Sequence, residues 1–296
     1  MKHYRLAALL AASAACTASS SIAEEDIDTT IAVSSGEVET SGTTVEEGKW
    51  LSIRALADIE TAYICRGYVW DSRPYSAQSV DGEADFGAYG RLVASVWTMS
   101  ALSGSGHSDD MGRYAYAEVD YVLRYSVDAQ IAEGWRLQNT VSRQWVTNPG
   151  YRRSHTLADW QAMQILHNPY VIPYWRLRYI HDPRQSAYWC VGLRKTVEVV
   201  DGLDFTADFF GDLGDHRHYR ALYGPKEDGG RYHAGLQALN LVLRLDYKLM
   251  DHVGIFAFVG QFCLVNRGAR DAIKASDLKQ AKRDLTYGGV GVTIDF

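Results

Sequence analysis

The sequence predicts an all-β protein, a single antiparallel transmembrane β-barrel of about 12 strands, and three observations support this fold class. Apolar and polar residues alternate along most of the chain after Trp50, as at 239–249, where every second residue is Leu or Tyr. The alternating segments are about 10–16 residues long, whereas strands of soluble sheets average about 5–6 and membrane-spanning strands need about 9–11. Tight connections also alternate with longer ones, as in barrels with short turns at one end and loops at the other.

The first 23 residues have the composition of a secretory signal peptide. Two basic residues precede an apolar run at 6–15, and small residues before Glu24 suit cleavage after residue 23. The apolar run is too short to cross a membrane as a helix. Lipidation of Cys16, which follows two alanines, is the alternative.

Residues 24–49 are expected to form a disordered acidic tail in the periplasm. The segment contains eight acidic residues, lacks aromatic residues, and has no basic residue before Lys49. Such a composition cannot bury enough apolar surface to fold. A periplasmic docking peptide is the functional alternative for this tail. No basic patch anywhere in the chain suggests a nucleic-acid partner.

The barrel domain is expected to occupy residues 50–296. Two segments, 113–127 and 238–249, show the alternation most clearly, because a helical period would mix charged residues into the apolar stripe. The least regular stretch is 157–181, where Pro169 and Pro173 interrupt the pattern, since Pro cannot donate a ladder hydrogen bond. The expected strands are 50–70, 74–81, 86–101, 113–127, 131–147, 157–167, 169–181, 186–199, 203–214, 233–249, 253–267 and 284–296.

The connections between these strands fix the orientation of the barrel. An even number of strands returns both ends of the barrel domain to the same side, the periplasm, where the short turns lie. The long connections, at 102–112, 148–156, 215–232 and 268–283, would then face outside. The tight connections are expected at 82–85, 128–130, 167–169, 200–202 and 250–252.

The apolar side of each strand is expected to face lipid. Shifting 238–249 by one residue would turn Arg244, Asp246 and Lys248 outward, and Arg or Lys at the bilayer midplane costs about 2–4 kcal/mol. This cost selects the register. The residues expected to contact lipid include Val119, Leu123, Leu241, Leu243 and Leu245.

The polar side of each strand is expected to line a pore. Rows of bases opposite rows of acids would create a transverse field that orients polar solutes. The alternative is that these charges pair and fill a narrow lumen. The expected pore-lining residues are Arg54, Asp58, Glu60, Glu118, Asp120, Arg124, Arg136, Arg176, Arg178, Arg194, Arg244 and Asp246.

The last strand, 286–296, resembles the closing strand of a bacterial outer-membrane barrel. Val292, Ile294 and Phe296 share its apolar face, and the chain ends on the aromatic residue. These three residues are expected to be the assembly signal that the barrel-assembly machinery recognises. The strand should pair with 50–70 to close the wall, and the expected location is the cell outer membrane.

Several short motifs are spread over about the first 100 residues of the barrel. They are Tyr63-Ile64-Cys65-Arg66-Gly67, Pro74, Gln78, Asp81, Trp97, Glu118-Val119-Asp120-Tyr121 and Asn148-Pro149-Gly150. Together these motifs resemble the TorF family of outer-membrane barrels, to which a porin role is ascribed. The resemblance implies an outer-membrane barrel and adds little about any solute.

No catalytic site, metal site or cofactor is expected. Cys65, Cys190 and Cys263 are widely spaced and odd in number, which predicts separate packed thiols and no disulfide framework. Ser154-His155 is the only pair that suggests a lipid hydrolase, but adjacent side chains on a strand point apart.

The function expected from the sequence is passive diffusion of small hydrophilic solutes through a narrow outer-membrane pore. A closed structural or surface-interaction barrel is the alternative, followed by a lipid hydrolase and by an exported soluble β protein that buries the apolar faces. The expected partners are outer-membrane lipid and lipopolysaccharide, which basic residues in the outer loops would contact. The sequence predicts no oligomeric state.

Overall fold

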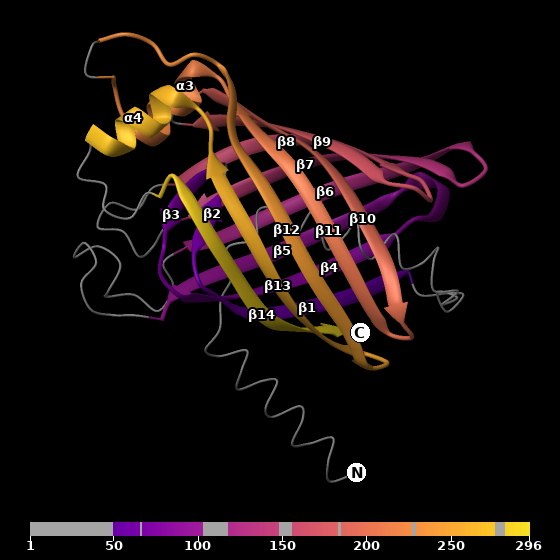
Figure 1. Cartoon of the computed structure of the whole chain (residues 1–296). Coiled ribbons are helices and arrows are strands. Elements are labelled where there is room, and N and C mark those ends of the chain that lie inside the picture. The colour runs from indigo at the N-terminus through magenta and orange to yellow at the C-terminus, as the bar shows by residue number, and fades with distance from the viewer. Residues whose placement is uncertain are drawn as a thin grey trace.

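The computed structural model describes residues 50–65, 67–102, 118–147, 156–182, 185–226, 229–275 and 282–296, which form a closed barrel of twelve antiparallel strands (Figure 1). The predicted fold class and strand number are therefore confirmed. The elements are β1 (Leu51–Glu60), β2 (Tyr63–Cys65), β3 (Tyr68–Asp71), β4 (Tyr75–Asp85), η1 (Gly87–Tyr89), β5 (Arg91–Ala101), β6 (Glu118–Ala132), β7 (Trp135–Thr147), β8 (Thr156–His167), β9 (Ile172–Asp182), β10 (Ser186–Val200), β11 (Leu203–Gly214), α3 (His216–Tyr223), β12 (Gly235–Met250), β13 (Val253–Leu264), α4 (Arg267–Ala275) and β14 (Asp284–Asp295).

The barrel wall has an apolar outer surface and a largely polar inner surface. Along β10, Val191 and Leu193 are half exposed on the outside, whereas Arg194, the residue after Leu193, is buried inside. Phe209 on β11 is likewise exposed on the outer side, opposite Leu193 in the register. A soluble barrel would leave this apolar surface in water, so the surface fits contact with lipid.

The seam between the first and last strands closes the barrel. Ala57 of β1 faces Val292 of β14 in the antiparallel register. The backbone N–H of Phe296 donates to the carbonyl of Ile53 at 2.8 Å, and Ile53 N–H donates back at 3.2 Å. The predicted pairing of the last strand with the first is therefore confirmed.

The two ends of the barrel differ. At one end, here called the turn end, the connections are 86–90, 133–134, 168–171, 201–202 and 251–252. The opposite end, the loop end, carries β2, β3, α3 and α4 (Figure 1). Among the described residues, neither helix is long and apolar enough to span a membrane.

Two predicted turns were placed too early in the chain. The predicted turn at 128–130 lies within β6, and the chain turns at 133–134, where Gly134 has a φ of +70°. Residues 82–85 lie within β4, and the turn that follows ends at Gly90 with a φ of +95°. Glycine adopts a positive φ at little cost, so these glycines set the turns.

The Pro-interrupted stretch forms two full strands, β8 and β9. Asn168 lies between them, and its Oδ1 accepts from the backbone N–H groups of Tyr170 at 3.0 Å and Val171 at 3.1 Å. Pro169 therefore lies in an ordered turn. The pairing of β9 with β8 begins at Tyr174, so the missing N–H of Pro173 does not interrupt that ladder.

Two of the long connections contain short helices that the sequence did not predict. Asp215 precedes α3, and its Oδ1 accepts from the backbone N–H of His218 at 2.6 Å. Gly224 ends the helix with a φ of +78°. These are the usual signals for the start and end of a helix, at Ncap and after the last turn.

Lumen-facing aromatic rings lie over glycines of neighbouring strands. A Cβ atom added at Gly291 of β14 would approach the ring of Phe256 and would lie 2.5 Å from the Cβ of Asp58. Gly289 has the same relation to Phe258. The small residues of the last strand thus make room for inward rings next to the seam.

Gly291→Val is therefore expected to destabilise the barrel by about 1–3 kcal/mol through overpacking. The ring of Phe256 can rotate away, but the Cβ of Asp58 belongs to the paired strand and cannot. The measurement is the urea midpoint of unfolding in lipid vesicles, followed by tryptophan fluorescence. Gly82→Val is the control, because a Cβ at Gly82 meets no atom within 4 Å. Equal midpoints for the two variants would contradict the packing argument.

Candidate functional site in the barrel lumen

The hairpin β2–β3 folds into the loop end of the lumen. The strand predicted at 50–70 is therefore too long, because β1 ends at Glu60 and the following residues form the hairpin. Gly67 forms the hairpin turn with a φ of +68°, and its carbonyl accepts from Gln237 Nε2 of β12 at 2.7 Å. The hairpin thus reaches β12 from its origin between β1 and β4, and narrows the lumen.

Both faces of the hairpin pack against the inner wall. Tyr63 and Cys65 belong to a buried cluster with Trp97 of β5. On the other face, Ile64 and Val69 belong to the cluster that includes the inward phenylalanines of β13. The hairpin is therefore held in the lumen mainly by apolar packing on both of its faces, and does not depend on one hydrogen bond.

Residues that carried the resemblance to the TorF family meet at the base of this hairpin. The hydroxyl of Tyr63 donates to Glu118 Oε1 of β6 at 2.9 Å, and its ring centroid lies 6.5 Å from that of Trp97. The hydroxyl of Tyr75 donates to Glu60 beside them. Glu118 therefore supports the hairpin here. Arg66 and the motif 148–150 lie outside the described residues.

Helix α3 covers the hairpin at the loop end. The ring of Tyr223 meets that of Tyr68 edge-on at 5.4 Å, and Gln237 Nε2 donates to the Tyr223 hydroxyl at 3.1 Å. Burial raises the pKa of Tyr219 to about 12 and raises the pKa of Tyr223 as well. These phenols stay neutral at physiological pH, so the aromatic contacts between α3 and the hairpin are uncharged.

The structure places the residues predicted to line the pore on the inner side of the wall. Three of them, Arg54, Arg136 and Asp246, lie toward the turn end and are partly exposed. The others are buried within the barrel. These are Asp58, Glu60, Glu118, Asp120, Arg124, Arg176, Arg178, Arg194 and Arg244.

Acids and bases inside the barrel lie next to each other. Arg194 Nη2 lies 2.6 Å from Asp208 Oδ2, and the two residues are direct partners on β10 and β11. Arg178 Nη1 lies 3.7 Å from Asp159 Oδ2. Arg54 Nε lies 2.5 Å from Asp295 Oδ1. This arrangement favours the alternative in which the charges pair, and not two separate rows of opposite sign.

Uncharged polar side chains continue the network across β6, β7 and β8. Gln144 Nε2 donates to Asp120 Oδ2 at 2.7 Å, and Gln161 Nε2 donates to Gln144 Oε1 at 3.2 Å. Ser126 and Thr140 share a hydrogen bond of 3.0 Å nearer the turn end. Such cross-strand bonds satisfy buried polar groups and make the inner wall rigid.

An acidic row lies at the turn end of the lumen. Glu198 of β10 is the direct partner of Asp204 of β11, which is in turn the partner of Asp246 of β12. Glu198 is exposed and the two aspartates are partly exposed, so water reaches this row. Arg244 pairs with Asp246 at 2.7 Å. The turn-end mouth on this side is therefore wet and carries negative charge.

The residues predicted to face lipid lie on the outer surface. Leu123, Leu241 and Leu245 are each more than two-fifths exposed, and Val119 and Leu243 are partly exposed. In the last strand, Val292 and Ile294 are partly exposed and Phe296 is exposed. The role of these three residues as an assembly signal stays a prediction.

No group of three or more potential metal ligands occurs in the described part of the chain. Cys65, Cys190 and Cys263 are not joined in disulfides. The suggestive pair Ser154-His155 lies outside the described residues.

No protein-family model matches the sequence, and no curated protein matches it. Among solved structures, the COG4313 outer membrane channel from Pseudomonas putida F1 is similar with a TM-score of 0.50 and 10% identity, over 86% of this chain and 100% of that chain. A KdgM porin in complex with disordered oligogalacturonate has a TM-score of 0.47 and 9% identity, over 83% of this chain and 99% of that one. Outer membrane phospholipase A from Escherichia coli has a TM-score of 0.44 and 14% identity, over 82% and 92%. At these identities the likeness concerns the fold, and the chain has the fold of a bacterial outer-membrane β-barrel.

Proposed function

We propose that this protein is an outer-membrane channel for small hydrophilic solutes, restricted at its loop end by the hairpin β2–β3. The observation that carries the proposal is the contrast between the two ends of one closed barrel. The turn end has exposed charges such as Glu198, whereas the loop end is narrowed by a buried hairpin. A barrel of twelve strands lies between the filled lumen of about eight strands and the open channel of about 16–18.

The proposal includes the orientation and the partners inferred from the sequence. The loop end faces outside, and the turn end faces the periplasm together with the acidic tail at 24–49, after removal of residues 1–23. The outer wall contacts lipid and lipopolysaccharide. The barrel-assembly machinery recognises Val292, Ile294 and Phe296. The TorF family remains the proposed relative, on the residues that meet at the hairpin base.

Planar-bilayer conductance of the full-length protein tests this function. A reproducible single-channel conductance with a measurable ion preference is expected from a charged, narrow lumen. A folded barrel that never conducts would contradict a constitutively open channel. Folding is checked independently by the heat-dependent shift in gel mobility typical of intact barrels.

A closed structural barrel is the second candidate function. It is favoured by the deep burial of bulky inward side chains, among them Trp97, Tyr75 and Tyr188. The two candidates differ in the conductance of the wild type, because a channel conducts with the hairpin in place and a closed barrel does not.

Glu198→Gln combined with Asp204→Asn is expected to shift the reversal potential toward anions. The two carboxylates face each other on adjacent strands at the wet turn end, so they attract cations into the lumen. The measurement is the reversal potential in a potassium chloride gradient. Glu133→Gln is the matched control, since it removes one acid in an exposed turn at the same end. An unchanged reversal potential in the double variant would remove the acidic row from the selectivity mechanism.

A further inference from the structure

Arg143 of β7 lies on the outer, membrane-facing side of the wall. Its neighbours along the strand, Ser142 and Gln144, are buried inside the barrel. Its direct register partners are Leu123, 45% exposed, and Trp160, 52% exposed. A cationic side chain is thus inserted among apolar residues that face lipid. This position differs from every charge described above, all of which lie inside the lumen or at its mouths.

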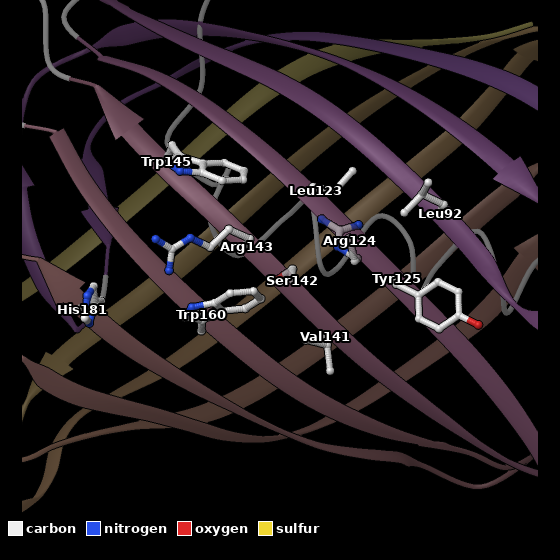
Figure 2. A pocket seen from close by; sticks show the side chains of 10 residues that line it. All are labelled: Leu92, Leu123, Arg124, Tyr125, Val141, Ser142, Arg143, Trp145, Trp160 and His181. Carbon is white, nitrogen blue, oxygen red and sulfur yellow. The ribbon is translucent and has the colours of Figure 1, made fainter.

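Two tryptophans hold the guanidinium group. The Cζ atom of Arg143 lies 4.9 Å from the ring centroid of Trp160 and 5.6 Å from that of Trp145. Figure 2 shows Arg143 extending between the two rings toward His181. These residues line a groove of about 600 Å³ in the outer wall, together with apolar side chains such as Leu92 and Val141.

The charge of Arg143 is not neutralised by the described residues. Its Nη1 atom is shielded from solvent and has no hydrogen-bond partner among them. No ion pair with a described carboxylate is formed. Cation–π contacts stabilise a guanidinium, but they leave its charge and its donors in place.

The height of the groove in the wall identifies the kind of ligand. Arg143 lies four residues before Thr147, the loop end of β7. At this level Trp145 and Trp160 form part of an aromatic girdle, the zone where lipid headgroups begin. An Arg on the lipid face costs little free energy near the interface and more at greater depth. An anionic headgroup would both offset this cost and satisfy the free donors.

We propose that the groove around Arg143 binds a phosphate group of lipopolysaccharide lipid A, with an acyl chain along Leu92, Leu123 and Val141. The inference rests on the proposed orientation, in which the loop end faces outside, where lipopolysaccharide forms the outer leaflet. The planar guanidinium donates two parallel hydrogen bonds to phosphate oxygens, while the tryptophans fix its direction. His181 lies at the far side of the groove, where it can contact the same headgroup.

The test measures binding of purified, bis-phosphorylated lipid A to the full-length barrel in detergent by native mass spectrometry. Arg143→Gln is expected to weaken binding about tenfold, which is the loss of one charge-assisted contact. Arg143→Lys should restore part of the affinity, because lysine keeps the positive charge but lacks the two parallel N–H donors of the guanidinium. Arg270→Gln is the control, since Arg270 is a loop-end cation on α4 outside the groove. Wild-type affinity in Arg143→Gln would overturn the proposal.

Further probes separate the possible occupants. Dephosphorylated lipid A should bind weakly to the wild-type protein. Its affinity should be no higher than that of phosphorylated lipid A for the Arg143→Gln variant. Equal binding of phosphatidylglycerol would overturn the assignment to lipopolysaccharide, and full competition by inorganic phosphate would reduce the groove to an ion site. Arg143 faces away from the lumen, so the Arg143→Gln variant should conduct as the wild type does. Failure of this proposal is thereby distinguishable from failure of the channel.

Discussion

Replacing residues 61–74 with Asn-Gly is expected to raise single-channel conductance severalfold and to weaken ion selectivity. Glu60 and Tyr75 are direct register partners on β1 and β4, so a two-residue turn can join them without shifting either strand. The replacement removes the hairpin that packs from β4 to β12 across the loop end of the lumen. Pore width then depends on the strand wall and α3.

Gln237→Ala is the graded companion to this deletion. It removes the hydrogen bond to the Gly67 carbonyl at the tip of the hairpin but leaves the apolar packing at its base. A smaller increase in conductance, or brief openings, is therefore expected. If the deletion variant folds and conducts as the wild type does, the hairpin is not the restriction. If only the deletion variant conducts, the hairpin acts as a plug, and the closed barrel describes the resting protein.

The strands were predictable because their pattern is local. Each residue of a strand alternates in facing with the next, so the apolar side of β12 can be recognised without knowing its neighbours. The pairing of β1 with β14 followed from closure, since a barrel in lipid leaves no edge unpaired. The same reasoning placed Arg124 and Arg194 on the inner side.

The hairpin was not predictable from the same pattern. Alternation continues from β1 through β2 and β3, so residues 50–70 look like one long strand. The contact that defines the fold, Gly67 with Gln237, joins residues 170 positions apart. The available signals were the density of tyrosines around Gly67 and the likeness to a family motif in the same stretch. Only the three-dimensional structure connects Tyr63 to Glu118.

The ion pairs inside the lumen depend on strand register, which alternation alone does not give. Arg194 meets Asp208 because β10 and β11 pair at that position, and a shift of two residues would separate them without changing their facing. Arg143 shows the opposite case. Its facing could have been read from the alternation in β7, since Ser142 and Gln144 are polar on one side and Val141 and Trp145 are apolar on the other.

Leu243→Arg is expected to reduce the free energy of unfolding by about 2–4 kcal/mol, the cost of Arg near the bilayer midplane. Leu243 lies near the middle of β12, on the outer surface beside Val259. Unfolding in urea from lipid vesicles measures the loss. Arg244→Leu is the matched variant at the next position, and a smaller loss is expected from it.

The milder effect of Arg244→Leu follows from its surroundings. The substitution removes the pair with Asp246 and the stacking of the guanidinium 4.0 Å over the ring of Phe256. Asp246 keeps contact with water, however, and a leucine packs well against the ring. A larger loss of unfolding free energy for Arg244→Leu than for Leu243→Arg would contradict the assignment of Leu243 to the lipid face and of Arg244 to the lumen. In a detergent-free aqueous state, Leu243→Arg would cost little, so its cost in vesicles also measures contact of β12 with lipid.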